Sequence, residues 1–78
     1  MEYWNYRVIK KGDGYYVGEV YYDHDGRVSN WTYSSYNPLS DHEDVDELKS
    51  TVRKILAALD KPVLVWKSDG GKDRLEEE

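Results

Sequence analysis

The side chains best suited to acid–base or metal chemistry in this chain are two histidines, each flanked by acids. His24 lies in residues 23–26 (DHDG) and His42 lies in residues 41–44 (DHED). The first segment resembles the start of a calcium-binding loop, but the later acidic ligands and the bidentate glutamate of such a loop do not follow it. Asp and Gly equally suit a tight hairpin turn, and acids suit the start of a helix. We therefore expect a turn and a helix entry here, and no metal site.

The serines and glycines form no catalytic motif. No serine lies in a nucleophile elbow or beside a histidine that a third group could orient. The pairs Gly12-x-Gly14 and Gly70-Gly71 are too short for a phosphate cradle, and neither leads from a strand into a helix. With no cysteine, thiolate nucleophiles, disulfides and thiolate metal sites are excluded. The sequence therefore predicts neither an enzyme nor a cofactor site.

The charge of the chain bears on its partners. Its 78 residues include 16 acids and 11 bases, a formal charge of −5. Nucleic-acid binders depend on concentrated Lys and Arg, so direct nucleic-acid binding is not expected. The balance fits a protein that sits on another molecule's basic surface, and it fits ordinary solubility equally well.

Localisation is predicted from the apolar runs. Runs such as residues 55–59 (ILAAL) and 63–66 (VLVW) are far shorter than the roughly 20 residues of a membrane helix, so no membrane contact is expected. Glu2 and aromatic residues follow Met1, in place of the basic and then apolar pattern of a signal sequence. We expect a cytoplasmic protein.

Three strand-like runs open the chain, over residues 3–10, 15–22 and 27–33. Gly and Asp occupy both connections, and these residues tolerate the positive φ of hairpin turns. The runs therefore predict an antiparallel meander. The loop that follows, residues 34–43, is rich in turn formers.

A helix is expected next, because Asp44 and Glu47 have the spacing of a capping box. Pro62 places its end near residue 59 or 60. Apolar residues recur at helical period, namely Val45, Leu48, Val52, Ile55, Leu56 and Leu59. Residues 63–67 predict a fourth strand. Residues 68–78 are Gly- and charge-rich, and we expect them to be a disordered tail after a single domain of residues 1–67.

The predicted fold is α+β, with two layers: a three-stranded antiparallel meander, then one helix and a fourth strand (β-β-β-α-β). A helix with one apolar stripe covers one sheet face and leaves the other open. Strand alternation assigns to the covered face Trp4, Tyr6, Val8, Val20 and either Val28 or Trp31. Both faces are rich in aromatics, so the reverse assignment stays open.

The open face is the expected functional surface. Eight Tyr and three Trp with no Phe favour half-buried or interface positions, although strand propensity alone also favours these residues. Few basic residues flank the strands, so we expect a protein contact in preference to stacked RNA bases. The predicted partner-binding residues are Tyr3, Tyr15, Tyr21, Tyr33, Trp31, Glu19, Asp23 and Asp25.

Two segments resemble a known family. Residues 14–20 (GYYVGEV) and 43–49 (EDVDELK) are similar to the N-terminal domain of HicB-type antitoxins, and the resemblance spans about residues 4–66. It implies a degenerate RNase H-like fold without activity that neutralises a small basic RNA-cleaving toxin. In this chain the second strand ends in an Asp-Gly turn where the family has a Pro- and Gly-containing loop. Only eleven polar residues follow the last predicted strand, so the family's DNA-binding segment and autorepression are not expected. The chain also resembles small uncharacterised bacterial and phage proteins that end in a Lys-Pro-Val-Leu strand, here residues 61–64.

The sequence therefore predicts a non-enzymatic, acidic binding protein. It would inhibit or occupy a protein or nucleoprotein with a basic surface, as an antitoxin or a phage anti-CRISPR protein does. Three alternatives stay open: a single-stranded RNA-binding module that uses the aromatic sheet face, a homodimeric domain, and a hydrolase or nuclease with an acidic metal site.

Overall fold

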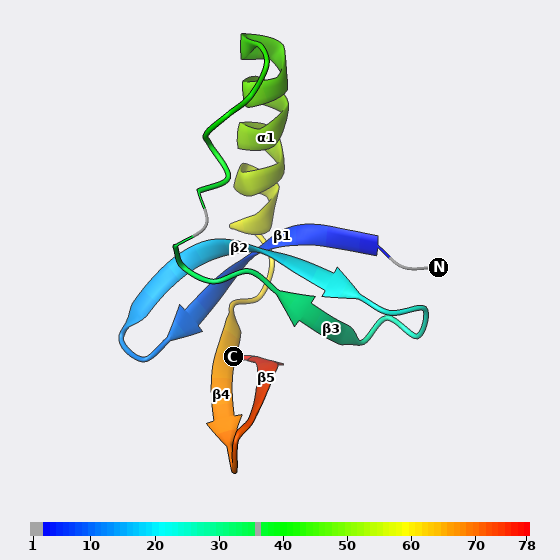
Figure 1. The fold of residues 1–78 in the computed structure, drawn as a ribbon, viewed down its shortest axis with the longest axis vertical. Helices are drawn as coiled ribbons and strands as arrows, with labels where there is room; N and C mark the ends of the chain where they lie inside the picture. The colour runs from blue at the N-terminus through cyan, green and yellow to red at the C-terminus, as the bar shows by residue number, and fades with distance from the viewer. Residues whose placement is uncertain (1–2, 36) are drawn as a thin grey trace.

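The computed structural model describes residues 3–35 and 37–78, which form five strands and one helix (Figure 1). In chain order these are β1 (Tyr3–Lys11), β2 (Gly14–Tyr22), β3 (Val28–Trp31), α1 (Val45–Ala58), β4 (Leu64–Asp69) and β5 (Lys72–Glu77). The strands form one sheet in the order β3-β2-β1-β4-β5. β1 and β4 run parallel, and the other neighbouring pairs run antiparallel.

The predicted two-layer β-β-β-α-β fold is wrong. The sheet is mixed and has a fifth strand, and the helix does not lie across one of its faces. The parallel pair between β1 and β4 is short, joining Ile9 to Leu64 and Lys10 to Val65. Beyond this pair β4 diverges from β1 and forms a hairpin with β5, which Figure 1 shows projecting from the rest of the sheet.

The fifth strand lies where we expected a disordered tail. Gly70 and Gly71 both have positive φ, 60° and 82°, which is the backbone of a two-residue hairpin turn. This turn reverses the chain, so that β5 pairs with β4 from Asp69 opposite Lys72 to Leu64 opposite Glu77. The segment 68–78 is therefore part of the domain.

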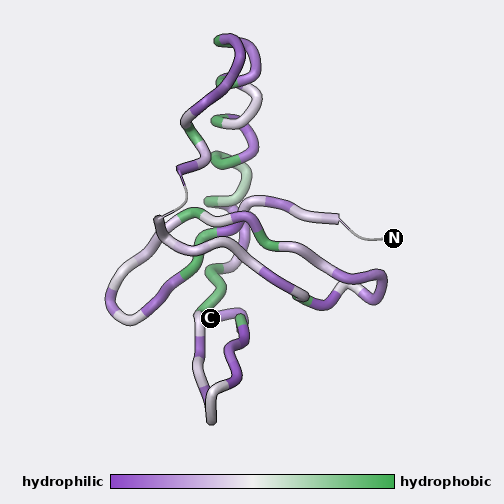
Figure 2. Tube along the Cα trace, in the orientation of Figure 1, coloured by the Kyte–Doolittle hydropathy of each residue, from purple (hydrophilic) through white to green (hydrophobic). Residues whose placement is uncertain are grey.

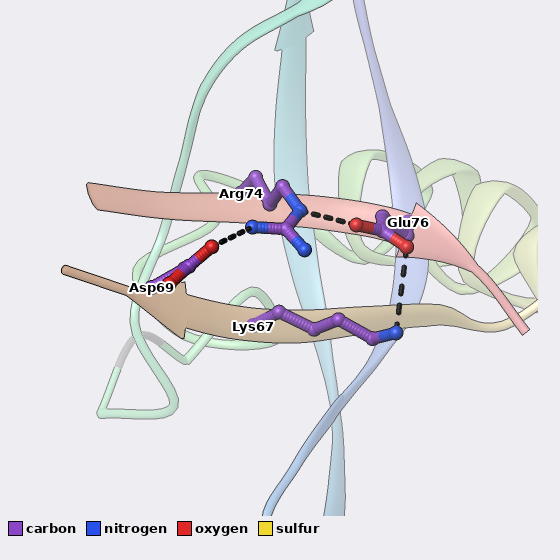
Figure 3. A network of polar contacts seen from close by, with 4 residues as sticks. All are labelled: Lys67, Asp69, Arg74 and Glu76. Carbon is purple, nitrogen blue, oxygen red and sulfur yellow. Dashed lines mark hydrogen bonds and ion pairs between the residues drawn. The ribbon is translucent and has the colours of Figure 1, made fainter.

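Charged side chains link the two strands of this hairpin (Figure 3). Lys67 Nζ lies 3.4 Å from Glu76 Oε1, and Arg74 Nη1 lies 3.6 Å from Asp69 Oδ2. Arg74 Nε also donates a hydrogen bond to Glu76. Hydrogen bonds from Arg74 and then Lys67 hold the pKa of the Glu76 carboxyl below its usual value. The charge-rich composition that suggested disorder thus supplies complementary cross-strand pairs.

The hydrophobic core lies inside the curved sheet. Ile9, Val20, Tyr22 and Leu64 are buried together on one face of the sheet. Trp31 of β3 and Trp66 of β4 meet edge to face at 5.3 Å, although β2 and β1 lie between their strands in the sheet order. The sheet must therefore curve until its two sides meet over the core, and the helix is not needed to cover that face.

Polar contacts determine where the helix begins and how its far end is attached to the sheet. Glu47 N–H donates to Asp44 Oδ1 at 2.8 Å, and Glu43 N–H donates to Glu47 Oε2 at 3.3 Å. This confirms the predicted cap, with the reciprocal bond made one residue earlier than in the usual capping box. At the other end, buried Arg7 donates through Nη2 to the Pro62 carbonyl oxygen at 2.7 Å. This bond fixes the segment between α1 and β4 against β1.

The predicted membership of the helix-covered face is also wrong. The β1–β2 ladder places Val20 opposite Asn5 and Glu19 opposite Tyr6, so Val20 and Tyr6 lie on different faces. Val20 belongs to the core face, whereas Trp4 and Tyr6 lie on the outer face, where they line a hollow with residues of α1. Trp31 packs against the core with Val28.

Candidate protein-binding surfaces

The outer face of the β1–β2 hairpin is an aromatic surface that the helix covers only at one end. Register and alternation place eight side chains on it, and we call this set the aromatic face: Trp4, Tyr6, Val8, Lys10, Tyr15, Val17, Glu19 and Tyr21. At about 3.3 Å per residue, its two ends at Trp4 and Tyr15 lie roughly 20 Å apart. Trp4 is 43% exposed and Tyr15 is 58% exposed.

Aromatic contacts and cations hold the rings of this face in place. Trp4 meets Tyr6 edge to face at 5.2 Å and lies 6.3 Å from the Tyr21 ring. Lys54 Nζ lies 5.9 Å from the Trp4 ring centroid, and Lys10 Nζ lies 5.7 Å from that of Tyr15. Rings that are already ordered lose little side-chain entropy when a partner covers them.

Glu19 and Tyr21 form a polar pair within the aromatic face. The Tyr21 hydroxyl donates to Glu19 Oε1 at 2.5 Å. This hydrogen bond, aided by partial burial and the negative charge of Glu19, raises the pKa of Tyr21 to about 12. The hydroxyl keeps its proton and holds the Glu19 carboxylate in one position.

A hollow of about 300 Å³ lies where α1 meets this face. Its walls are Trp4, Asn5, Tyr6, Lys54, Ala57 and Lys61. The two aromatic rings and the two ammonium groups give it the chemistry to accept an apolar or anionic side chain. This end of the aromatic face is therefore basic, unlike the chain as a whole.

The structure brings only part of the predicted site together. Tyr15, Glu19 and Tyr21 share the aromatic face. Tyr3 lies on the opposite face of β1, where it stacks on Tyr22 at 4.6 Å. Trp31 and Tyr33 both pack against Trp66, so they belong to the core face and its rim.

The two predicted acids lie in the β2–β3 turn. The Asp23 carboxylate accepts hydrogen bonds from the backbone N–H groups of Asp25 at 2.9 Å and Arg27 at 3.0 Å. The bond from Arg27, followed by that from Asp25, lowers the pKa of Asp23 below its usual value. Asp23 therefore stabilises the turn, while Asp25 is exposed beside His24.

Sequence reasoning missed a second surface, on the helix. Val45 is 64% exposed, Val52 47%, Leu56 63% and Leu59 58%, and we call these four residues the helix stripe. All residues of α1 are described, and only Ala58 among them is buried. Figure 2 shows apolar residues recurring along α1 in the part that stands away from the sheet. The small residues Ala57 and Ala58 lie on the side of α1 that faces the sheet. The larger apolar residues of the helix stripe therefore face away from the sheet, and the two alanines are the sequence signal that could have indicated this.

The acidic and histidine side chains do not form a metal site in the described part of the chain. Within residues 3–35 and 37–78, no three His, Asp or Glu side chains gather closely enough to hold a metal ion. His42 is instead hydrogen-bonded through Nε2 to Thr51 Oγ1 at 2.7 Å, which ties the loop before α1 to the helix. No helix in the described part of the chain is long and apolar enough to span a membrane.

Comparisons with protein-family models, curated proteins and solved structures find no match. The resemblance to HicB-type antitoxins therefore stays a prediction.

Proposed function

We propose that this protein is a non-enzymatic binding protein that occupies and inhibits a protein or nucleoprotein partner, as an antitoxin or a phage anti-defence protein does. The aromatic face carries the proposal. It presents two exposed rings, Trp4 and Tyr15, on a β-hairpin that the core holds rigid from behind. Tyr and Trp on a preordered surface are the usual anchors of protein interfaces.

The charge supports a partner with a basic surface. The formal charge is −5, and an acidic protein is drawn toward a basic groove before contact. Asp25 is exposed in the turn that follows β2. Lys54 and Lys61 beside Trp4 would meet acidic or apolar side chains of the same partner.

The experiment is affinity purification of the tagged chain from its host, with mass spectrometry of the proteins that co-elute. Two tyrosines of similar exposure provide a matched pair of variants. Tyr15→Ala removes a ring of the aromatic face, and Tyr33→Ala removes a ring at the rim of the opposite face, exposed by 58% and 64% in the native chain. We expect one stoichiometric partner that Tyr15→Ala loses by at least about tenfold and that Tyr33→Ala retains.

Equal capture by both variants would refute a role for the aromatic face. Partner binding that is unaffected by high salt would refute the charge contribution. The competing function is single-stranded RNA binding, in which bases stack on the same rings. Tight binding of labelled oligonucleotides at low salt, lost in Tyr15→Ala, would replace the protein partner with RNA.

A further inference from the structure

The helix stripe is unexplained by the fold of one chain. At 3.6 residues per turn its four side chains lie along one side of α1, and Lys54 and Ala57, which line the hollow against β1, lie on the other. The stripe extends to Leu59, directly after the helix, and covers about 21 Å of helix length. The fold therefore directs this surface away from its own sheet.

The spacing of the stripe is symmetric. With half-buried Leu48 included, the positions on this side of the helix are 45, 48, 52, 56 and 59, so the intervals read three, four, four, three in either direction along the helix. Ile55 is also apolar and half-buried, and it lies at the edge of the stripe, between Val52 and the buried Ala58. Val52 stands at the centre. A surface with this property matches a copy of itself laid antiparallel across a two-fold axis, as symmetric dimer interfaces require.

We propose that a second copy of this chain covers the helix stripe, with the two α1 helices antiparallel and Val52 on the two-fold axis. Val45 then contacts Leu59 of the second copy, Leu48 contacts Leu56 of the second copy, and Val52 contacts Val52 of the second copy. The proposal goes beyond the function proposed above, because it uses a different surface and leaves the aromatic face free.

A hollow beside the stripe fits the pairing at its two ends. It has a volume of about 380 Å³ and lies at the start of α1, where Leu39, Val45 and Leu48 form its apolar part and Asp41, His42, Glu43 and Asp44 form the rest of its walls. The antiparallel arrangement brings Leu59 of the second copy to this place. Leu39 is itself 49% exposed, so the same contact would cover it.

The exposed area is close to what a dimer needs. A Val or Leu exposed to this degree carries on the order of 100 Å² of apolar surface, so two stripes bring together roughly 800 Å². Side chains beside the stripes and Leu39 add the rest of the 1,200–2,000 Å² that specific interfaces bury. The share of one chain is about 400 Å², which is within the range of the largest apolar patch on a typical monomer, and such patches are often functional.

The chain is more extended than a compact domain of its length, as expected for a protein whose helix packs against a second copy. Its radius of gyration is 13.2 Å and its longest extent is 43 Å. A compact domain of this length has a radius of gyration of about 11.5 Å. The projecting helix and the β4–β5 hairpin lie at opposite ends of the long axis (Figure 1), and pairing with a second helix would give α1 the lateral contacts that it lacks.

The first test exploits the two-fold axis through position 52. Val52→Glu places two carboxylates against each other and should weaken the dimer by about 100-fold or more, and Val52→Lys should do the same. Mixed together, the two variants should form a one-to-one heterodimer, because position 52 faces position 52. Tyr33→Glu introduces the same charge at an exposed position outside the stripe and should leave the dimer intact. Mass is read by light scattering after gel filtration, against 9.2 kDa for one chain.

The second test reports on the geometry of the dimer. The chain has no cysteine, so Val52→Cys introduces a unique thiol, which we expect to form a disulfide-linked dimer on mild oxidation. The neighbouring variant Arg53→Cys turns the thiol away from the partner helix and should cross-link at least about tenfold less. Far-UV circular dichroism must match the native spectrum in each variant.

A native chain that stays at 9.2 kDa at concentrations of several hundred micromolar would overturn the proposal. So would a dimer that persists in Val52→Glu. A dimer that is lost in both charged variants and not restored on mixing, or equal cross-linking from positions 52 and 53, would overturn the antiparallel arrangement. Partner capture by Val52→Glu is measured in parallel, so failure of this inference is distinguishable from failure of the proposed function.

Discussion

Gly18 in the middle of β2 is the position where one added methyl group should be felt most. A Cβ there would lie 3.0 Å from Thr32 Oγ1 and 3.1 Å from both Ile9 Cδ1 and Tyr16 Cε2. These atoms are held in place, because Ile9 is fully buried and Thr32 Oγ1 accepts a hydrogen bond from the Glu19 N–H at 2.9 Å. The Gly18→Ala variant must therefore displace these core side chains or break the hydrogen bond between Glu19 and Thr32.

The cost follows from these contacts. Overpacking a core by one methyl group costs about 1–3 kcal/mol, and the lower flexibility of Ala in the unfolded chain returns about 0.4–1 kcal/mol. We expect Gly18→Ala to lower the free energy of unfolding by about 1.3 kcal/mol. With a urea dependence of about 1 kcal/mol per molar for a domain of this size, the unfolding midpoint should fall by about 1.3 M.

The chain offers a matched control in the same strand. A Cβ at Gly14 would find its nearest neighbour, the Lys11 carbonyl oxygen, at 3.8 Å, which is ordinary contact. Gly14→Ala should therefore unfold within about 0.5 kcal/mol of the native chain. The assay is urea unfolding followed by tryptophan fluorescence at one fixed protein concentration. Equal midpoints for the two variants would refute the close approach at Gly18.

Three further substitutions test the helix cap, the buried arginine and the tyrosine–carboxylate pair. Asp44→Ala should cost about 1 kcal/mol of unfolding free energy and Asp44→Ser much less, and equal values would contradict the cap. Arg7→Met keeps the apolar length of the side chain but leaves the Pro62 carbonyl oxygen without its donor, so thermal unfolding should show a loss of about 2 kcal/mol. The pKa of Tyr21 is raised to about 12 in the folded chain from about 10 in the unfolded chain. The hydrogen bond of the neutral phenol to Glu19 therefore stabilises the fold fully below pH 10, and this stabilisation is lost between pH 10 and 12. Glu19→Gln should return the phenolate absorbance titration of Tyr21 toward pH 10, and an unchanged titration would exclude the hydrogen bond as its cause.

Local patterns predicted the helix and the first three strands because each depends on contacts near in sequence. Asp44 and Glu47 determine where α1 starts, and Gly at the turns reverses the chain. The direction in which the helix points is different, because a stripe of helical period is the same for a core and for an interface between chains. The exposed Val52 and Leu56 show that this stripe is not part of the core of a single chain.

The sheet was predicted less well because its assembly depends on distant pairs. The parallel pairing of Ile9 with Leu64 leaves no local mark in the sequence. The fifth strand did leave one, since Gly70-Gly71 is a two-residue hairpin turn, but the surrounding charge suggested disorder. Alternation predicted the faces within each strand, whereas the cross-strand register decided that Tyr6 lies with Glu19 and away from Val20.

Because α1 is attached to the sheet mainly at its last turn, through Ala58 and the Arg7 bond to Pro62, we expect the chain to open as two cooperative units. Backbone amides of β1 and β2 should exchange with deuterium only on global unfolding, because their hydrogen bonds surround the core. Amides in the first turns of α1 should exchange through local fraying, since tertiary contacts hardly restrain them. Pairing with a second helix would supply those contacts, so the exchange rate of α1 alone should fall as protein concentration rises.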